Sequence, residues 1–249
     1  MKLSLHKADQ RGFAEHGWLH SRFSFSFADY HNRERMGFGA LRVINDDIIE
    51  PSAGFGMHPH RDMEIITVVI KGSLEHRDSE GNHGIITAGQ IQYMSAGSGV
   101  HHSEFNPSPN ERVELFQIWI HPHTKGLPPH YVQRECRDLD TKNRWALMAS
   151  GDGRKGSIPI RQDASIKTAH LYPGHTLVSD PIKPGYGRLL LVIDGEVDVC
   201  DHTLRRRDEL QIVGDDPFEI RADMDAHLIL FDVPMAVRAI ANRPLTSQQ

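Results

Sequence analysis

Short segments rich in Val, Ile, Thr, Phe and Tyr recur along the chain, and Gly, Asn, Asp and Pro separate them, whereas helical periodicity is scarce. Three examples are GALRVINDD (39–47), MEIITVVIKGSLEHRD (63–78) and ERVELFQIWIHP (111–122). Regularly spaced short strands with tight turns are typical of antiparallel sandwiches and barrels. We therefore expect an all-β fold with a few short helices.

The second half of the chain repeats the pattern of the first. Aligning IITVVIKGSLEHRD (65–78) with RLLLVIDGEVDVCD (188–201) places Gly72 on Gly195. Self-similarity of this kind indicates two copies of one β-unit.

A proline-led, charged stretch, 128–145, lies between the two copies and is the predicted linker region. We accordingly expect two domains, 1–130 and 131–249.

The composition excludes two classes of partner. The chain has 28 Lys and Arg against 33 Asp and Glu, a formal net charge of −5, and these charges are scattered. Scattered charges give no electrostatic footprint for nucleic acid or for an anionic membrane. Small molecules or proteins are the expected partners.

The cysteines and the apolar runs predict the compartment. Cys136 and Cys200 are too few for a disulfide framework, so we expect free thiols in a reducing environment. The N-terminal stretch has no apolar core of signal-peptide length, and the apolar run at 188–195 is far too short to span a bilayer. We expect a cytoplasmic protein.

Two histidine clusters suggest a metal site. The motif HPH sets His58 and His60 two residues apart, and HSE sets His102 and Glu104 two residues apart. Side chains two apart on a strand point to the same face, so each pair should converge. Three imidazoles with one carboxylate suit Fe(II), Mn(II), Ni(II), Cu(II) or Zn(II), and open positions would allow activation of dioxygen or substrate.

Glu64 competes with Glu104 for the fourth position. It shares the parity of His58 and His60 if the strand continues past Pro59. Proline removes a ladder hydrogen bond and marks an edge or a bulge, so parity across it is not secure. The residues alone leave both carboxylates open.

The second copy lacks these side chains. At the positions opposite His58, His60 and Glu64 it carries Pro181, Lys183 and Gly187. We therefore expect any metal to be bound by the first half only.

A second HPH motif, His121 to His123, closes an apolar strand and runs into a polar loop, TKGLPPH. We expect these to be surface histidines and not ligands. His101, next to His102, should point to the opposite face of its strand.

Several stretches resemble the pirin family of the cupin superfamily, and the similarity is close to the bacterial pirin-like quercetin 2,3-dioxygenases. They lie between residues 10 and 125: GWLHSRFSFSFADY (17–30), MGFGALRVINDDII (36–49), GFGMHPHRDMEI (54–65), GSLEHRDSEGN (72–82) and MSAGSGVHHSEFNP (94–107). The resemblance implies a bicupin, that is, two facing antiparallel β-barrels (double-stranded β-helices). It implies a metal-binding N-terminal cupin at 1–130 and a degenerate C-terminal cupin without ligands at 131–249.

Carried onto this sequence, the resemblance implies four metal ligands: His58, His60, His102 and Glu104. It thus favours Glu104 over Glu64. The implied cofactor is one divalent ion, Fe²⁺ before Mn²⁺, Ni²⁺, Cu²⁺, Co²⁺ or Zn²⁺.

The implied activity is that of a mononuclear metal-dependent dioxygenase, a flavonol 2,4-dioxygenase, which cleaves flavonols such as quercetin at the 2,3-bond and releases carbon monoxide. Its partners would be a small aromatic substrate and dioxygen, with Glu104 as the catalytic base. The alternative is an iron-binding, redox-sensing regulatory protein that acts through a protein partner. Because both need the same ligands, the sequence does not separate them, and a cupin enzyme with another substrate also fits.

Aromatic residues bear on the substrate. Phe25, Phe27, Phe38 and Phe55 could wall a pocket for a flat ring, but we expect at least half of them to be core. Phe23 stands where many bacterial members of the family carry histidine, which puts the pocket lining in question.

Overall fold

The computed structural model describes residues 1–136, 141–214 and 216–236. The described residues form strands and two short 3₁₀ turns, Ala8–Gln10 and Arg154–Gly156, so the predicted all-β class is confirmed. The strands form two large and two small sheets. All strand pairs are antiparallel apart from β13 and β14.

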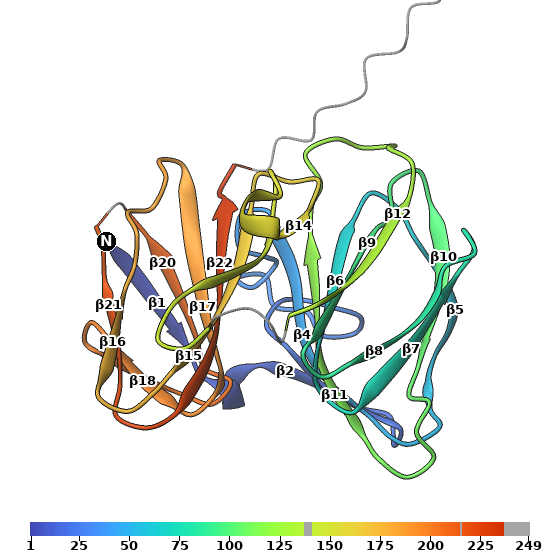
Figure 1. The fold of residues 1–249 in the computed structure, drawn as a ribbon, viewed down its shortest axis with the longest axis horizontal. Helices are drawn as coiled ribbons and strands as arrows, with labels where there is room; N and C mark the ends of the chain where they lie inside the picture. The colour runs from blue at the N-terminus through green and yellow to red at the C-terminus, as the bar shows by residue number, and fades with distance from the viewer. Residues whose placement is uncertain (137–140, 215, 237–249) are drawn as a thin grey trace, which may run out of the picture.

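In the first half, one large and one small sheet face each other (Figure 1). The first large sheet has the order β12 (His130–Glu135), β9 (Gln90–Ser95), β6 (Glu64–Lys71), β11 (Val113–Ile120), β4 (Leu41–Ile49), β3 (Leu19–Phe23) and β2 (Gly12–Glu15). The first small sheet has the order β5 (Gly54–His60), β10 (Val100–Phe105), β7 (Ser73–Asp78) and β8 (His83–Thr87).

The second half repeats this arrangement. The second large sheet has the order β1 (Lys2–His6), β20 (Glu209–Val213), β17 (Tyr186–Asp194), β22 (Ala226–Pro234), β15 (Ser165–Leu171), β13 (Ala146–Ser150) and β14 (Ile158–Pro159). The second small sheet has the order β16 (His175–Val178), β21 (Glu219–Ala222), β18 (Glu196–Val199) and β19 (His202–Arg205).

Gly72 and Gly195, which the repeat aligns, lie at the turns of equivalent hairpins. Gly72 joins β6 to β7 and Gly195 joins β17 to β18, with φ of 77° and 85°. A Cβ on Gly72 would lie 2.7 Å from the Arg112 carbonyl oxygen, and one on Gly195 would lie 2.0 Å from the Asp225 carbonyl oxygen. Both positions therefore need glycine for conformation and for space.

The halves exchange their edge strands. β1, at the start of the chain, pairs with β20 in the second large sheet, whereas β12, which begins at His130, pairs with β9 in the first. Each of these strands thus pairs with the half on the other side of the predicted boundary near residue 130. The division into 1–130 and 131–249 stays a prediction.

The large sheets of the two halves lie against each other in the middle of the molecule (Figure 1). The main hydrophobic cluster takes Ile44 and Phe116 from the first large sheet and Leu191 and Ile229 from the second. The small sheets lie on the outside.

The spaces within the two halves are filled differently. In the second half a continuous apolar cluster, which includes Val197, Leu210, Ile220 and Leu228, fills the gap between the large and small sheets. In the first half, polar side chains and a cavity occupy the corresponding place. The candidate site therefore lies in the first half.

Within the described ranges, no helix has the length and apolar character needed to cross a membrane.

Candidate metal centre

Strands β5 and β10 bring three histidines together. In their antiparallel register His58 lies directly opposite His102, and His60 lies opposite Val100. The imidazole centroids are 4.4 Å apart for His58 and His102 and 4.8 Å apart for the other two pairs. One nitrogen from each ring lies within 4.8 Å of the others, so this group could hold a metal ion.

The protonation of these rings suits metal binding. Burial lowers the pKa of His60 to about 4 and that of His102 to about 2, and the neighbouring histidines add to both shifts. Both rings are therefore neutral at pH 7 and offer a lone pair. His58 Nδ1 lies 2.8 Å from the Gly56 carbonyl oxygen; as the donor there, it leaves Nε2 free to accept.

A fourth histidine, His76, supports His102 and was not singled out from the sequence. It is fully buried on β7, and its Nδ1 lies 3.4 Å from Nδ1 of His102. On its other side, His76 Nε2 lies 3.3 Å from the carboxylate of Asp78. If Asp78 accepts from Nε2, Nδ1 of His76 can accept from Nδ1 of His102, which leaves the lone pair of His102 on Nε2.

The Nε2 atom of His102 is buried and has no hydrogen-bond partner among the described residues. A buried polar atom without a partner is costly, and a metal ion would remove that cost. The donor set and this unpaired atom together fit a metal ion.

Glu104 follows His102 by two residues on β10, beyond a register shift that separates the two along β5. Its carboxylate is buried and accepts hydrogen bonds from Gln117 Nε2 at 2.8 and 2.7 Å, one to each oxygen. Together with His76 and His102 it forms a second group able to hold a metal ion. Burial raises the pKa of Glu104 to about 7.

Glu64 lies elsewhere. Its fully buried carboxylate accepts from the hydroxyls of Tyr93 and Ser95 and from the backbone N–H of Arg161 at 3.0 Å. The parity that linked it to His58 and His60 does not apply, because β5 ends at His60 and β6, which begins at Glu64, belongs to the other sheet.

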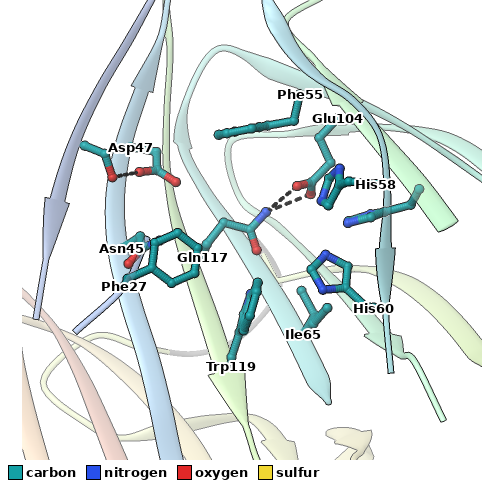
Figure 2. A pocket seen from close by; sticks show the side chains of 12 residues that line it. Phe27, Asn45, Asp47, Phe55, His58, His60, Ile65, Glu104, Gln117 and Trp119 are labelled. Atoms are coloured by element: carbon teal, nitrogen blue, oxygen red, sulfur yellow. Dashed lines mark hydrogen bonds between the residues drawn. The ribbon is translucent and has the colours of Figure 1, made fainter. Parts of the chain in front are cut away.

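A pocket lies beside the three histidines and Glu104 (Figure 2). Its volume, including the space open to solvent, is about 600 Å³. Its apolar walls are Phe27, Phe55, Ile65 and Trp119. Trp119 also meets His60 edge-on, with ring centroids 4.9 Å apart.

The four phenylalanines divide as expected. Phe27 and Phe55 line the pocket, whereas Phe25 and Phe38 are buried in the core. Phe23 is also buried and does not line the pocket; it packs on Phe27, with ring centroids 5.5 Å apart.

The other histidines singled out from the sequence lie outside the candidate site, and of the two predicted surface histidines His123 is exposed whereas His121 is not fully so. His123 is exposed and its Nδ1 contacts the Arg161 carbonyl oxygen at 2.6 Å, while His121 is half-buried, and neither belongs to the two groups above. His101 is exposed on the other face of β10.

Pro181 and Lys183, which stand opposite His58 and His60 in the repeat, line a charged pocket of the second half. There Lys183 forms an ion pair with Asp163 at 2.6 Å.

Known proteins match the chain over most of its length. Residues 5–120 match the Pirin family model, and residues 147–233 match the model of the quercetinase C-terminal cupin domain. A quercetin 2,3-dioxygenase of Escherichia coli (strain K12) is 44% identical over 230 residues, which are 92% of this chain and 98% of that protein. A pirin-like protein of Caulobacter vibrioides is 41% identical over 225 residues, 90% of this chain and 96% of that one.

Two solved structures share the fold. YhhW from Escherichia coli has a TM-score of 0.90 at 42% identity and covers 97% of this chain and 100% of its own. The complex of bacterial pirin YhhW with nickel(II) has a TM-score of 0.89, also at 42% identity, over 94% of this chain and 99% of that one. These similarities, together with the histidine and glutamate group, show that the chain belongs to the pirin family.

Proposed function

We propose that this protein is a metal-dependent dioxygenase that cleaves flavonols such as quercetin at the 2,3-bond and releases carbon monoxide. One observation carries the proposal: three histidines and a buried glutamate lie at an aromatic-walled pocket, in a chain 44% identical to a protein named quercetin 2,3-dioxygenase. The free thiols of Cys136 and Cys200 are consistent with the expected cytoplasmic location.

The proposed metal ligands are His58, His60, His102 and Glu104. We expect Fe²⁺ as the native ion, because imidazole and carboxylate donors suit it and the reaction uses dioxygen. Ni²⁺ is an alternative, since the related YhhW binds nickel(II). A bound divalent ion would supply Lewis acidity and, if it is redox-active, a path for electrons.

Glu104 is the proposed proton acceptor. A flavonol must lose the proton of its 3-hydroxyl before its ring becomes electron-rich enough to react with dioxygen. A carboxyl group with a pKa near 7 has nearly the ideal strength for taking up such a proton at neutral pH. Gln117 holds both carboxylate oxygens in place.

The aromatic walls would bind and shield the substrate. Phe27, Phe55 and Trp119 present flat or edge-on rings that can pack against a planar ligand. Their apolar surface also keeps water from the reacting atoms.

The test is turnover of quercetin by protein loaded with Fe²⁺ under anaerobic conditions and then exposed to air, followed by the loss of flavonol absorbance. His102→Ala should lose the activity and the metal, whereas the matched control His121→Ala, outside the site, should keep both. Equal activity in His102→Ala and wild type would refute the proposed site. A wild-type protein with one metal per chain and no turnover would instead favour the regulatory alternative.

A further inference from the structure

The pocket has a polar wall opposite the histidines. Asn45 and Asp47, both on β4, and Gln117 on β11 line it together with the aromatic residues (Figure 2). Asn45 and Gln117 are cross-strand neighbours in the register of β4 and β11. All three side chains are buried, with exposures of 4%, 2% and 7% for Asn45, Asp47 and Gln117.

Two carbonyl oxygens of this wall lack a hydrogen-bond donor in the part of the chain that the structure describes. Asn45 Oδ1 and Gln117 Oε1 are buried without a hydrogen-bond partner among the described residues. The orientation of Gln117 follows from its neighbour: its amide nitrogen donates to both oxygens of Glu104, so its carbonyl oxygen must face elsewhere. Asp47 adds a buried carboxyl group that accepts a hydrogen bond from the Ser21 hydroxyl.

The fold itself does not require this polar wall. Counted from Val113 and Ala226, which lie beside the equivalent hairpin glycines, Gln117 of β11 corresponds to Leu230 of β22. Leu230 is buried in the apolar cluster of the second half. The same strand position thus accepts a leucine where no pocket exists.

Buried acceptors need donors, and a ligand can bring them. We propose that Asn45, Asp47 and Gln117 determine specificity by accepting hydrogen bonds from hydroxyl groups on the part of the substrate that points away from the histidines. The substrate class is then a flat aromatic compound with a metal-binding oxygen at one end and phenolic hydroxyls at the other. This inference rests on the proposed function in one respect, that the substrate enters this pocket.

The test compares quercetin with 3-hydroxyflavone, which has the same carbonyl and 3-hydroxyl groups but no other hydroxyl. Dissociation constants are measured without oxygen on Ni²⁺-loaded protein, by quenching of tryptophan fluorescence, so that no turnover is needed. Wild-type protein should bind quercetin about tenfold more tightly or better, because the analogue leaves buried acceptors unpaired.

Two variants localise the effect. Asn45→Leu, which keeps the branched shape of the side chain but has no hydrogen-bond acceptor, should reduce the ratio of the two dissociation constants to within about twofold. The matched control Phe27→Leu removes aromatic wall and no acceptor, so it should weaken both ligands and keep the ratio. A thermal melt shows whether each variant is folded.

If wild type binds quercetin and 3-hydroxyflavone equally, the proposed hydroxyl site is wrong, whatever the variants do. It is also wrong if a folded Asn45→Leu protein keeps the wild-type ratio of dissociation constants, because water would then satisfy the buried acceptors. The proposed function fails separately. If quercetin binds much more tightly than 3-hydroxyflavone but no carbon monoxide is released, the dioxygenase proposal is wrong and the hydroxyl site is supported. If carbon monoxide is released but the two ligands bind equally, the dioxygenase proposal is supported and the hydroxyl site is wrong.

Discussion

At the scale of single residues, burial acts in opposite directions on the two kinds of proposed ligand. It lowers the pKa of His60 and His102, which keeps them neutral, and raises that of Glu104 to about 7, which favours its protonated form. Metal binding at neutral pH therefore competes with a proton at Glu104 and not at these two histidines.

The first prediction concerns the protons released when metal binds. Below about pH 7 Glu104 is protonated in the metal-free protein, so a metal ion must displace its proton, and affinity should fall as the pH falls. Wild type should release about one proton more than Glu104→Gln at pH 5.5, and the difference should vanish near pH 8.5. Calorimetry of Ni²⁺ binding in buffers of different ionisation enthalpy measures both numbers. Identical release by the two proteins at every pH would exclude Glu104 as a ligand.

The second prediction concerns His76. Removing the ring that orients His102 should weaken metal affinity about 10- to 100-fold without removing a ligand. We expect this loss in His76→Ala, measured by competition with a chelator of known affinity. His83→Ala changes an exposed histidine at the start of the neighbouring strand β8 and should retain wild-type affinity. Retention by both variants would show that His76 does not position His102.

At the scale of elements, the strands and the repeat were predictable from the residue pattern. The choice between Glu64 and Glu104 as the carboxylate beside the histidines was not. Continuous runs of apolar side chains mark β6 and β17, and the shared glycines mark their hairpins. Glu64 could not be rejected from its parity, because the sequence does not show that β5 and β6 belong to different sheets.

His76 was missed for a related reason. It lies in SLEHRD, where it shares the inward face of β7 with Leu74, and a lone histidine at such a position gives no signal of its own. Its contact with His102 depends on the pairing of β7 with β10, a long-range feature that strand periodicity does not reveal.

The third prediction concerns the contact between β5 and β10. A Cβ on Gly54 would lie 2.2 Å from the Glu104 carbonyl oxygen and 2.5 Å from the Phe105 Cα. Gly54→Ala should therefore push the strands apart, lower the free energy of unfolding by about 1–3 kcal/mol and weaken metal binding.

Gly56, two residues along the same strand, has open space around the position of its Cβ. Gly56→Ala is thus the matched control and should leave metal affinity and stability near those of wild type. Chemical denaturation and chelator competition compare the two variants. Equal behaviour would contradict the view that close strand contact sets the spacing of the histidines.

At the scale of the whole molecule, buried charges tie the two halves together. Glu209 of β20 is fully buried and accepts from Arg35 at 2.8 Å, with Arg11 Nε at 3.3 Å; both arginines belong to the first half. Breaking a buried pair leaves an uncompensated charge, which costs more than the pair itself contributes.

The fourth prediction follows from this cluster. Glu209→Gln should lower the free energy of unfolding by about 3–5 kcal/mol, because two buried guanidinium groups lose their carboxylate. Glu196→Gln, which removes the partner of the exposed Arg205, should have little effect. Chemical denaturation measures both. A similar small change in each variant would show that the halves do not depend on this cluster.

The molecule as a whole shows which features a sequence can predict. The lack of ligand side chains at Pro181 and Lys183 led us to predict that any metal is bound by the first half, where the structure brings three histidines together. The polar wall of Asn45 and Gln117 could not be predicted from the sequence. These residues lie side by side at the pocket because β4 pairs with β11, and the sequence does not show that pairing.

The most direct test of the central claim is the carbon monoxide released per flavonol consumed. Cleavage of the flavonol ring by one dioxygen gives one carbon monoxide and one ester product that retains both oxygen atoms of the dioxygen. Metal-loaded wild type should thus release one carbon monoxide per quercetin under ¹⁸O₂, with two labelled atoms in the ester. Loss of quercetin without carbon monoxide would show simple oxidation and would contradict the proposed dioxygenase.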